Sequence, residues 1–377
     1  MDTALQSNGF ASGPQKTLFA IAGGKGGVGK TTIAVTMGAV LADYGHKTVI
    51  VDADLGGANL HHAFGVLRPA VTIGDFIRGE QNDINRLVLE TTIPNLHIVA
   101  GSAGTLGMAD IRYDLKQKFL RHLHLIDAEY VILDIGAGTS FNQLDYFLEA
   151  TCGIVVITPD SLAIQDGFNF IKTSLLRKLF QLFQGEAALI ARLRPYFNLS
   201  RKSNPFSIAE ISEEIKAFGP EKFTRWRTVL AAFQPKIIVN KFESDKDFEE
   251  CAVLQIAAKD ILDLKLAEMY CIRNSQHVHN AIRNMCPDQL LGGDGIVIGD
   301  MQLIVEKICS NGFSRNRKIK IKTNRNHAEK DLYDEPDLFK GELICSIRCG
   351  LWENCSMQRG GYPCRIKIIG AANQKNI

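Results

Sequence analysis

The stretch Gly23–Thr32, GGKGGVGKTT, decides the fold that we expect for this chain. It follows the short apolar run Leu18–Ala22 and precedes Ile33–Tyr44, whose pattern predicts a helix. A strand, a glycine-rich loop and a helix in this order form a phosphate-binding loop, and Gly24–Thr31 satisfies its G-x-x-x-x-G-K-[ST] pattern in full. Glycines let the backbone wrap around a phosphate chain so that several N–H groups point inward. The stretch therefore predicts a site for a nucleoside triphosphate.

Two side chains of this loop have predicted roles. Lys30 is expected to reach the β- and γ-phosphates, and the hydroxyl of Thr31 is expected to hold Mg²⁺. The other predicted nucleotide-binding residues of the loop are Gly24, Gly26, Gly27, Val28, Gly29 and Thr32.

Lys25 lies inside the loop, in the pattern K-G-G-x-G-K-T. This pattern resembles the deviant Walker A motif of the MinD/ParA class of ATPases, which includes septum-site and flagellar-number regulators, partition ATPases and iron–sulfur carriers. The resemblance implies that Lys25 reaches across a dimer interface to the partner's nucleotide. It also implies that ATP drives the formation of a homodimer.

Three acids follow apolar strands, where ligands bind in open α/β sheets. The segment Asp52–Leu60 resembles the D-x-D-x-G-x-x-N-L segment of the MinD-like branch. That resemblance implies that Asp54 positions the attacking water and that Asp52 supports the Mg²⁺ shell. Tyr130–Asp134 has the Walker B pattern, so Asp134 is expected to bind Mg²⁺.

Asn240 ends the apolar run that begins at Pro235. It resembles the family asparagine that reads adenine through a bidentate hydrogen bond, which suits an amide because it offers both a donor and an acceptor. Further on, Ser275–Pro287 resembles the family's S-x-x-V-x-x-A-I-R…P helix, and Met301–Ile308 predicts the last core helix.

Length and composition agree with an α/β protein. The chain has 377 residues, of which 46% are hydrophobic and 22% charged, with a net charge of +2. We expect a mostly parallel, doubly wound sheet of the P-loop NTPase type, with a helical insert and a small cysteine-rich tail. The predicted domains are a flexible leader (1–16), the ATPase domain (17–311, with the insert at about 186–234), a basic linker (312–340) and the tail (341–377).

The insert and the linker leave alternatives open. Basic residues alternate with aromatic ones in the insert, which fits a solvated helical cap, the preferred interpretation, or else a surface for a protein partner or a nucleic acid. The small net charge argues against a nucleic-acid partner. The linker's basic residues, Arg315–Arg325, fit either a plain linker or an electrostatic membrane patch.

We find no transmembrane helix and no secretory signal, so we expect a cytoplasmic protein, with peripheral attachment at the inner membrane face as an alternative.

The tail concentrates four of the nine cysteines of the chain within twenty residues. Clustered thiols in a reducing compartment indicate Zn²⁺ or an iron–sulfur cluster, with redox-active or lipid-modified thiols and plain thiols as alternatives. The spacing matches no C-x₂-C knuckle. The candidate ligands are Cys345, Cys349, Cys355 and Cys364.

Three functions remain open on this basis. The favoured one is a MinD/ParA-like ATPase that binds Mg²⁺-ATP, dimerises and hydrolyses ATP to ADP and phosphate, as a switch that controls the place or number of a cellular structure. The flagellar-number branch is preferred because of the segment Asp52–Leu60. The alternatives are an iron–sulfur carrier ATPase and a nucleotide-gated scaffold. The sequence identifies neither the protein partner nor the process.

Overall fold

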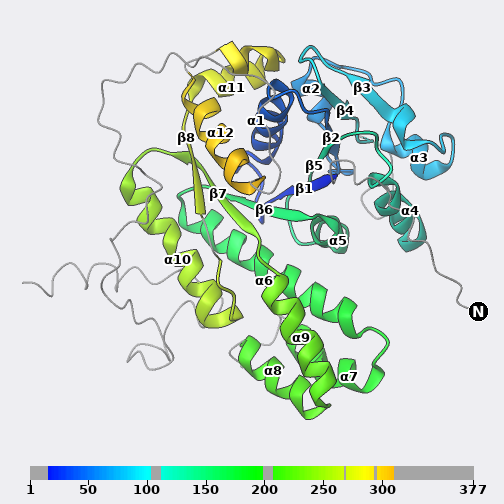
Figure 1. Ribbon diagram of the computed structural model, residues 1–377, viewed down its shortest axis with the longest axis vertical. Coiled ribbons are helices and arrows are strands. Elements are labelled where there is room, and N and C mark those ends of the chain that lie inside the picture. Colours follow the sequence, from blue (N-terminus) through cyan, green and yellow to red (C-terminus); the bar gives the residue numbers. More distant parts are fainter. Residues whose placement is uncertain (1–15, 103–111, 198–206, 267–268, 293–294, 310–377) are drawn as a thin grey trace, which may run out of the picture.

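An eight-stranded sheet forms the centre of the protein (Figure 1). The computed structural model describes residues 16–102, 112–197, 207–266, 269–292 and 295–309. The strand order is β3-β4-β2-β5-β1-β6-β7-β8, and every pairing is parallel except the one between β3 and β4. This confirms the mostly parallel, doubly wound sheet. The strands are β1 Thr17–Ala22, β2 Thr48–Asp52, β3 Val88–Glu90, β4 Leu96–Val99, β5 Tyr130–Asp134, β6 Cys152–Ile157, β7 Lys236–Phe242 and β8 Met269–Arg273.

Helices cover both faces of the sheet. On one face lie α1 (Lys30–Asp43), α2 (Leu60–Ala63), α11 (Gln276–Arg283) and α12 (Ile296–Ile308). On the other lie α3 (Ile73–Arg78), α4 (Tyr113–Leu123), α5 (Phe141–Glu149), α6 (Ser161–Phe183) and α10 (Asp245–Leu262). Two 3₁₀ turns, Ile84–Leu87 and Pro287–Gly292, complete this part of the chain.

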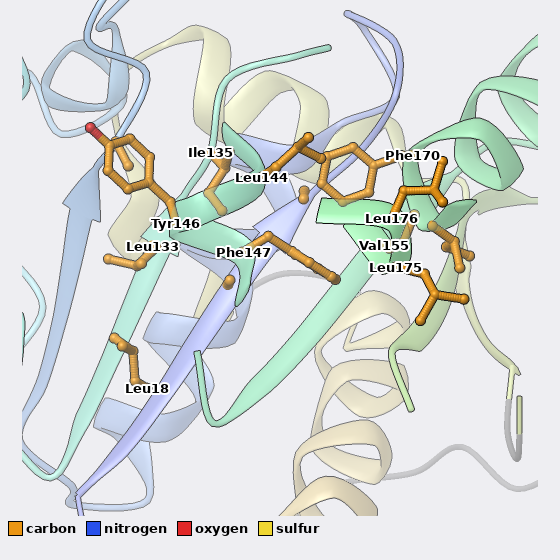
Figure 2. Close-up of a cluster of buried hydrophobic side chains, with 14 of the residues drawn as sticks. Leu18, Leu133, Ile135, Leu144, Tyr146, Phe147, Val155, Phe170, Leu175 and Leu176 are labelled. Carbon is orange, nitrogen blue, oxygen red and sulfur yellow. The ribbon is translucent and has the colours of Figure 1, made fainter. Parts of the chain in front are cut away.

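Alternating side chains along the central strands feed the two layers of core. In β1, Leu18 and Ala20 point to the α5–α6 side, whereas Phe19 and Ile21 point to the α1 side. Both faces of a parallel sheet are buried, which explains why the strands are continuous apolar runs. Figure 2 shows part of the core on the α5–α6 side of the sheet. There, Phe147 and Phe170 meet edge to face, with 5.0 Å between their ring centroids.

The helical insert forms a separate lobe beyond the end of α6 (Figure 1). Its described helices are α7 (Ala187–Phe197), α8 (Ile208–Ala217) and α9 (Pro220–Ala232). Trp226 is fully buried between them, and its Nε1 donates a hydrogen bond of 2.9 Å to the hydroxyl of Ser212. Burying a large aromatic ring whose N–H has a partner stabilises the packing of the three helices, and their buried side chains continue the core on the α6 side of the sheet.

The predicted elements and the structure differ at several places. The elements that were not predicted from the sequence include α4, α5, α10, β3 and β8. One face of α6 packs on the sheet, with Ile164, Ile171 and Leu175 buried. The basic linker and the cysteine tail lie outside the described residues.

Within the described part of the chain, no helix has the length and apolar character needed to cross a bilayer.

Candidate functional site

The glycine-rich loop joins β1 to α1 at the carboxyl edge of the sheet. Gly27 and Gly29 have φ angles of 83° and 94°, a region that favours glycine. At Gly24, a Cβ atom would lie 2.1 Å from the backbone oxygen of Asp166 in α6. At Gly26, no atom lies within 4 Å of the Cβ position. The backbone angles at Gly27 and Gly29 and the close packing at Gly24 therefore require glycine. A methyl group on Gly26 would meet no other atom of the chain.

Lys30 begins α1, with Gly29 as its N-cap. The first N–H groups of a helix lack partners within the helix, so they form an anion site beside the loop. The Lys30 ammonium donates to the carbonyl of Lys25 at 3.3 Å. Burial lowers the pKa of Lys30, and the charges of Asp134 and Asp54 oppose that shift. The loop therefore holds Lys30 close to Asp54 and Asp134.

Asp52 and Asp134 end the neighbouring strands β2 and β5 and are paired in register. Both are almost completely buried, at 1% and 4% exposure. Burial, together with the charge of Asp134, raises the pKa of Asp52 to about 7. Burial raises the pKa of Asp134 to about 6, against the hydrogen bond from Thr31 and the charge of Lys30.

These residues pass a simple test of fit for a divalent cation. Burial is the main reason that the pKa values of both carboxylates are raised, and for Asp52 the charge of Asp134 adds to it, so a bound cation would favour their ionised forms. Carboxylate and hydroxyl oxygens are the ligands that Mg²⁺ prefers. Thr31 and Asp134 are the residues that would hold the ion directly. The oxygens of Asp52 accept N–H groups of Asp54 and Leu60, at 3.2 and 3.0 Å, which suits a supporting role.

Asp54 lies between the loops that follow β2 and β5. Its Oδ1 accepts the N–H of Gly57 at 3.1 Å, and a Cβ atom on Gly136 would lie 2.7 Å from the same oxygen. The absence of a side chain at Gly136 thus lets the two loops meet at this carboxylate. Its predicted role towards an attacking water stays a prediction.

Asn240 is buried at the carboxyl end of β7, and its amide nitrogen donates to the carbonyl of Val28 at 2.9 Å. A Cβ atom on Gly29 would lie 2.2 Å from that nitrogen. Next to it, the ammonium of Lys241 lies 3.5 Å from the carbonyl of Gly27. The pair therefore fastens β7 to the loop, and the reading of adenine by Asn240 stays a prediction.

Lys25 projects from the outer side of the loop, with 42% of its side chain exposed. Its ammonium lies 4.0 Å from Asp160, whose other contacts include the N–H of Ala163 at the start of α6. A long contact between exposed groups is weak, so it leaves the lysine free to move. The predicted action of Lys25 across a dimer interface is not tested by a single chain.

Comparison with known proteins supports the interpretation of the loop. The ParA family model, described as NUBPL iron-transfer P-loop NTPase, matches residues 15–176. A Guillardia theta protein named for the septum site-determining protein MinD is 29% identical over 194 residues, which cover 51% of this chain and 69% of that protein. The segment 15–176 belongs to the ParA/MinD family of P-loop NTPases.

A second relative is matched over less of its length, and a solved structure over almost all of its length. The antiactivator FleN of Pseudomonas aeruginosa is 30% identical over 163 residues, which cover 41% of this chain but only 55% of FleN. The solved structure of MinD from Pyrococcus horikoshii, complexed with Mg-ADP, superposes with a TM-score of 0.52 at 15% identity. That superposition covers 78% of this chain and 98% of that one, and it supports the fold.

The structure adds residues to the candidate site that were not predicted from the sequence. They are Asp160, Asp166 and Lys241. Asp160 carried a signal, because it follows an apolar strand just as Asp54 and Asp134 do. Asp166 acts only through its backbone, which no residue pattern reveals. The four tail cysteines lie outside the described residues, and the described residues contain no group of three or more histidine, cysteine or acidic side chains placed to hold one metal ion.

Proposed function

We propose that this chain is an Mg²⁺-dependent ATPase of the MinD/ParA type. The observation that carries the proposal is the juxtaposition of Lys30 and Thr31 with the buried pair Asp52 and Asp134. This places a fixed cation, a helix N-terminus and a hard-metal ligand set around one loop. Such a set stabilises the negative charge of a triphosphate during transfer of its γ-phosphoryl group.

In the proposed reaction, water attacks the γ-phosphate in line with the leaving oxygen. Asp54 accepts a hydrogen bond from that water and orients it, while Lys30 and the loop N–H groups bind the phosphate oxygens. Bound Mg²⁺ supplies further positive charge to the phosphates. The products are ADP and inorganic phosphate.

We further propose that ATP binding joins two chains and that hydrolysis separates them. Lys25 supports this step because it is exposed on the loop and has only a distant anionic contact within its own chain. The dimer is a switch that controls the place or number of a cellular structure, in keeping with the names septum site-determining protein for MinD and flagellum site-determining protein for YlxH of Helicobacter pylori. Peripheral attachment to the cytoplasmic membrane face belongs to the same proposal.

Release of inorganic phosphate by the purified full chain tests the enzymatic part. We expect Mg²⁺-dependent turnover of ATP that falls at least ~100-fold in Lys30→Ala and in Asp54→Ala. Lys47→Ala is the matched control. Lys47 is partly exposed, pairs with Asp127 and lies just before the amino end of β2, at the edge of the sheet opposite the loop. Equal turnover in all four proteins would overturn the proposal.

A second function is favoured by two observations. The matching family model is described as an iron-transfer NTPase, and the chain carries four clustered cysteines after residue 344. An ATP-dependent iron–sulfur carrier would yield a brown, iron-containing protein after anaerobic purification. A colourless protein, with or without zinc, rules out that function and leaves the regulatory ATPase.

A further inference from the structure

A cavity of about 670 Å³ opens at the amino ends of the central strands, on the side of the sheet away from the nucleotide loop. Residues at the starts of β1, β5, β6 and β7 line it. The other walls come from the ends of α5, α9 and α12. Since α9 belongs to the insert, the insert builds part of this cavity, and neither Lys30 nor the acids of the site reach it.

The cavity is basic. Lys178 of α6 and Lys236 of β7 line it, and neither pairs with a carboxylate within the described residues. Lys16 also lines it, with its ammonium donating to the carbonyls of His124 and Ile126. The one acid in the lining, Glu129, already accepts hydrogen bonds from His46 and from the backbone of Lys47.

Apolar side chains line the same cavity as these lysines. Phe147 and Leu148 come from the end of α5, Val229 and Phe233 from the end of the insert, and Ile308 from α12. An ammonium beside apolar surface favours a ligand that carries both carboxylates and apolar groups. An acidic peptide containing leucine and aromatic residues has this chemistry.

The chain itself carries such a peptide next to the cavity. Cys309, the last described residue after α12, lines the cavity, so residues 310–377 start at its wall. Within that segment, Asp331–Phe339 (DLYDEPDLF) contains four acids, four leucine or aromatic residues and no basic residue. About twenty residues separate it from Cys309, which is enough chain to turn back into the cavity.

We propose that Asp331–Phe339 docks in this cavity, with its carboxylates on Lys178 and Lys236 and its leucine and aromatic side chains against Val229 and Phe233. The docked segment joins the insert to the end of α12 and holds the basic and cysteine-rich parts of the chain against the ATPase core. The site is separate from the nucleotide loop and does not depend on the proposed ATPase function.

Zero-length carbodiimide cross-linking of the full chain, read by peptide mass spectrometry, tests this proposal. The reagent joins a carboxylate to an amine only when the two are in contact. We expect cross-links from Asp334, Glu335 or Asp337 to Lys178 or Lys236. A mixture of unlabelled and ¹⁵N-labelled protein shows whether both ends belong to one chain, as the proposal requires.

Charge reversal provides the decisive comparison. The double variant Lys178→Glu/Lys236→Glu should lose these cross-links, and adding Asp334→Lys/Glu335→Lys/Asp337→Lys should restore them with the reversed polarity. The control Lys246→Glu changes an exposed lysine on α10 and should leave them intact. If the first double variant fails to fold, Lys178→Gln/Lys236→Gln replaces it. Cross-links between chains, cross-links chiefly to other lysines, or none at all would overturn the proposal.

Discussion

Gly24 is the residue of the loop with the tightest packing. A methyl group there would overlap the backbone oxygen of Asp166 at 2.1 Å, and backbone atoms cannot move aside as a flexible side chain can. We therefore expect Gly24→Ala to displace the loop from α6 and to weaken ATP binding at least ~10-fold, or about 1.4 kcal/mol. Titration of a fluorescent ATP analogue measures the affinity.

Gly299→Ala is the matched control for that prediction. It adds the same methyl group in α12, outside the predicted nucleotide site, in a place where no atom lies within 4 Å. Its affinity should stay within about twofold of the parent protein's, a difference of about 0.4 kcal/mol. Equal losses in both variants would mean that the loss at Gly24 does not come from its contact with α6.

At the scale of single residues, the sequence predicted which side chains lie near one another where the fold guarantees proximity. Parallel strands bring their carboxyl ends to one edge, so Asp52 and Asp134 could be placed together before the structure was known. The bond between Asn240 and Val28 joins residues 212 positions apart. Only the packing of β7 beside the loop brings these two residues together, so no local pattern indicates it.

Among the helices, α4, α5 and α6 are held together by one buried carboxylate. Asp145 of α5 is 4% exposed and accepts hydrogen bonds from Lys116 of α4 and from Arg177 and Gln181 of α6. Asp145→Asn leaves two largely buried cations without a counter-charge. We expect the free energy of unfolding to fall by about 3–5 kcal/mol, as measured by urea denaturation.

The exposed pair between Arg112 and Asp114 provides the control at this scale. Both side chains are largely exposed, at 79% and 60%. Pairs of this kind contribute roughly 0–1 kcal/mol, so Asp114→Asn should change stability little. A loss in Asp145→Asn no larger than in Asp114→Asn would show that the buried network does not hold the three helices together.

The elements that the sequence analysis missed have physical explanations. The strand β8 is short, with five residues, and the edge strand β3 has three, so neither gives a strong periodic signal. The helix α10 did carry signals, since Ser244 and Asp247 form a capping box and Cys251, Leu254 and Leu262 lie on its buried face. The insert was correctly expected to be helical, but its packing around Trp226 depends on contacts between helices.

At the scale of the whole molecule, the two ends of the sheet have different chemistry. The carboxyl edge carries the nucleotide loop with its acids, and the amino edge carries the basic cavity beside the insert. The ParA/MinD fold accounts for the first edge. The insert helix α9 and the segment after Cys309 contribute to the second, so they are the parts through which this chain is expected to differ from its relatives.

The central claim is that ATP joins two chains through Lys25. The most direct measurement is the mass of the protein in solution, by multi-angle light scattering with Mg²⁺-ATP and with Mg²⁺-ADP. In an Asp54→Ala background, where hydrolysis is slowed, we expect two chains with ATP and one with ADP. Adding Lys25→Ala should leave one chain in both nucleotides, whereas adding Lys47→Ala should change nothing. Dimers that persist with ATP in the Lys25→Ala protein would contradict the account.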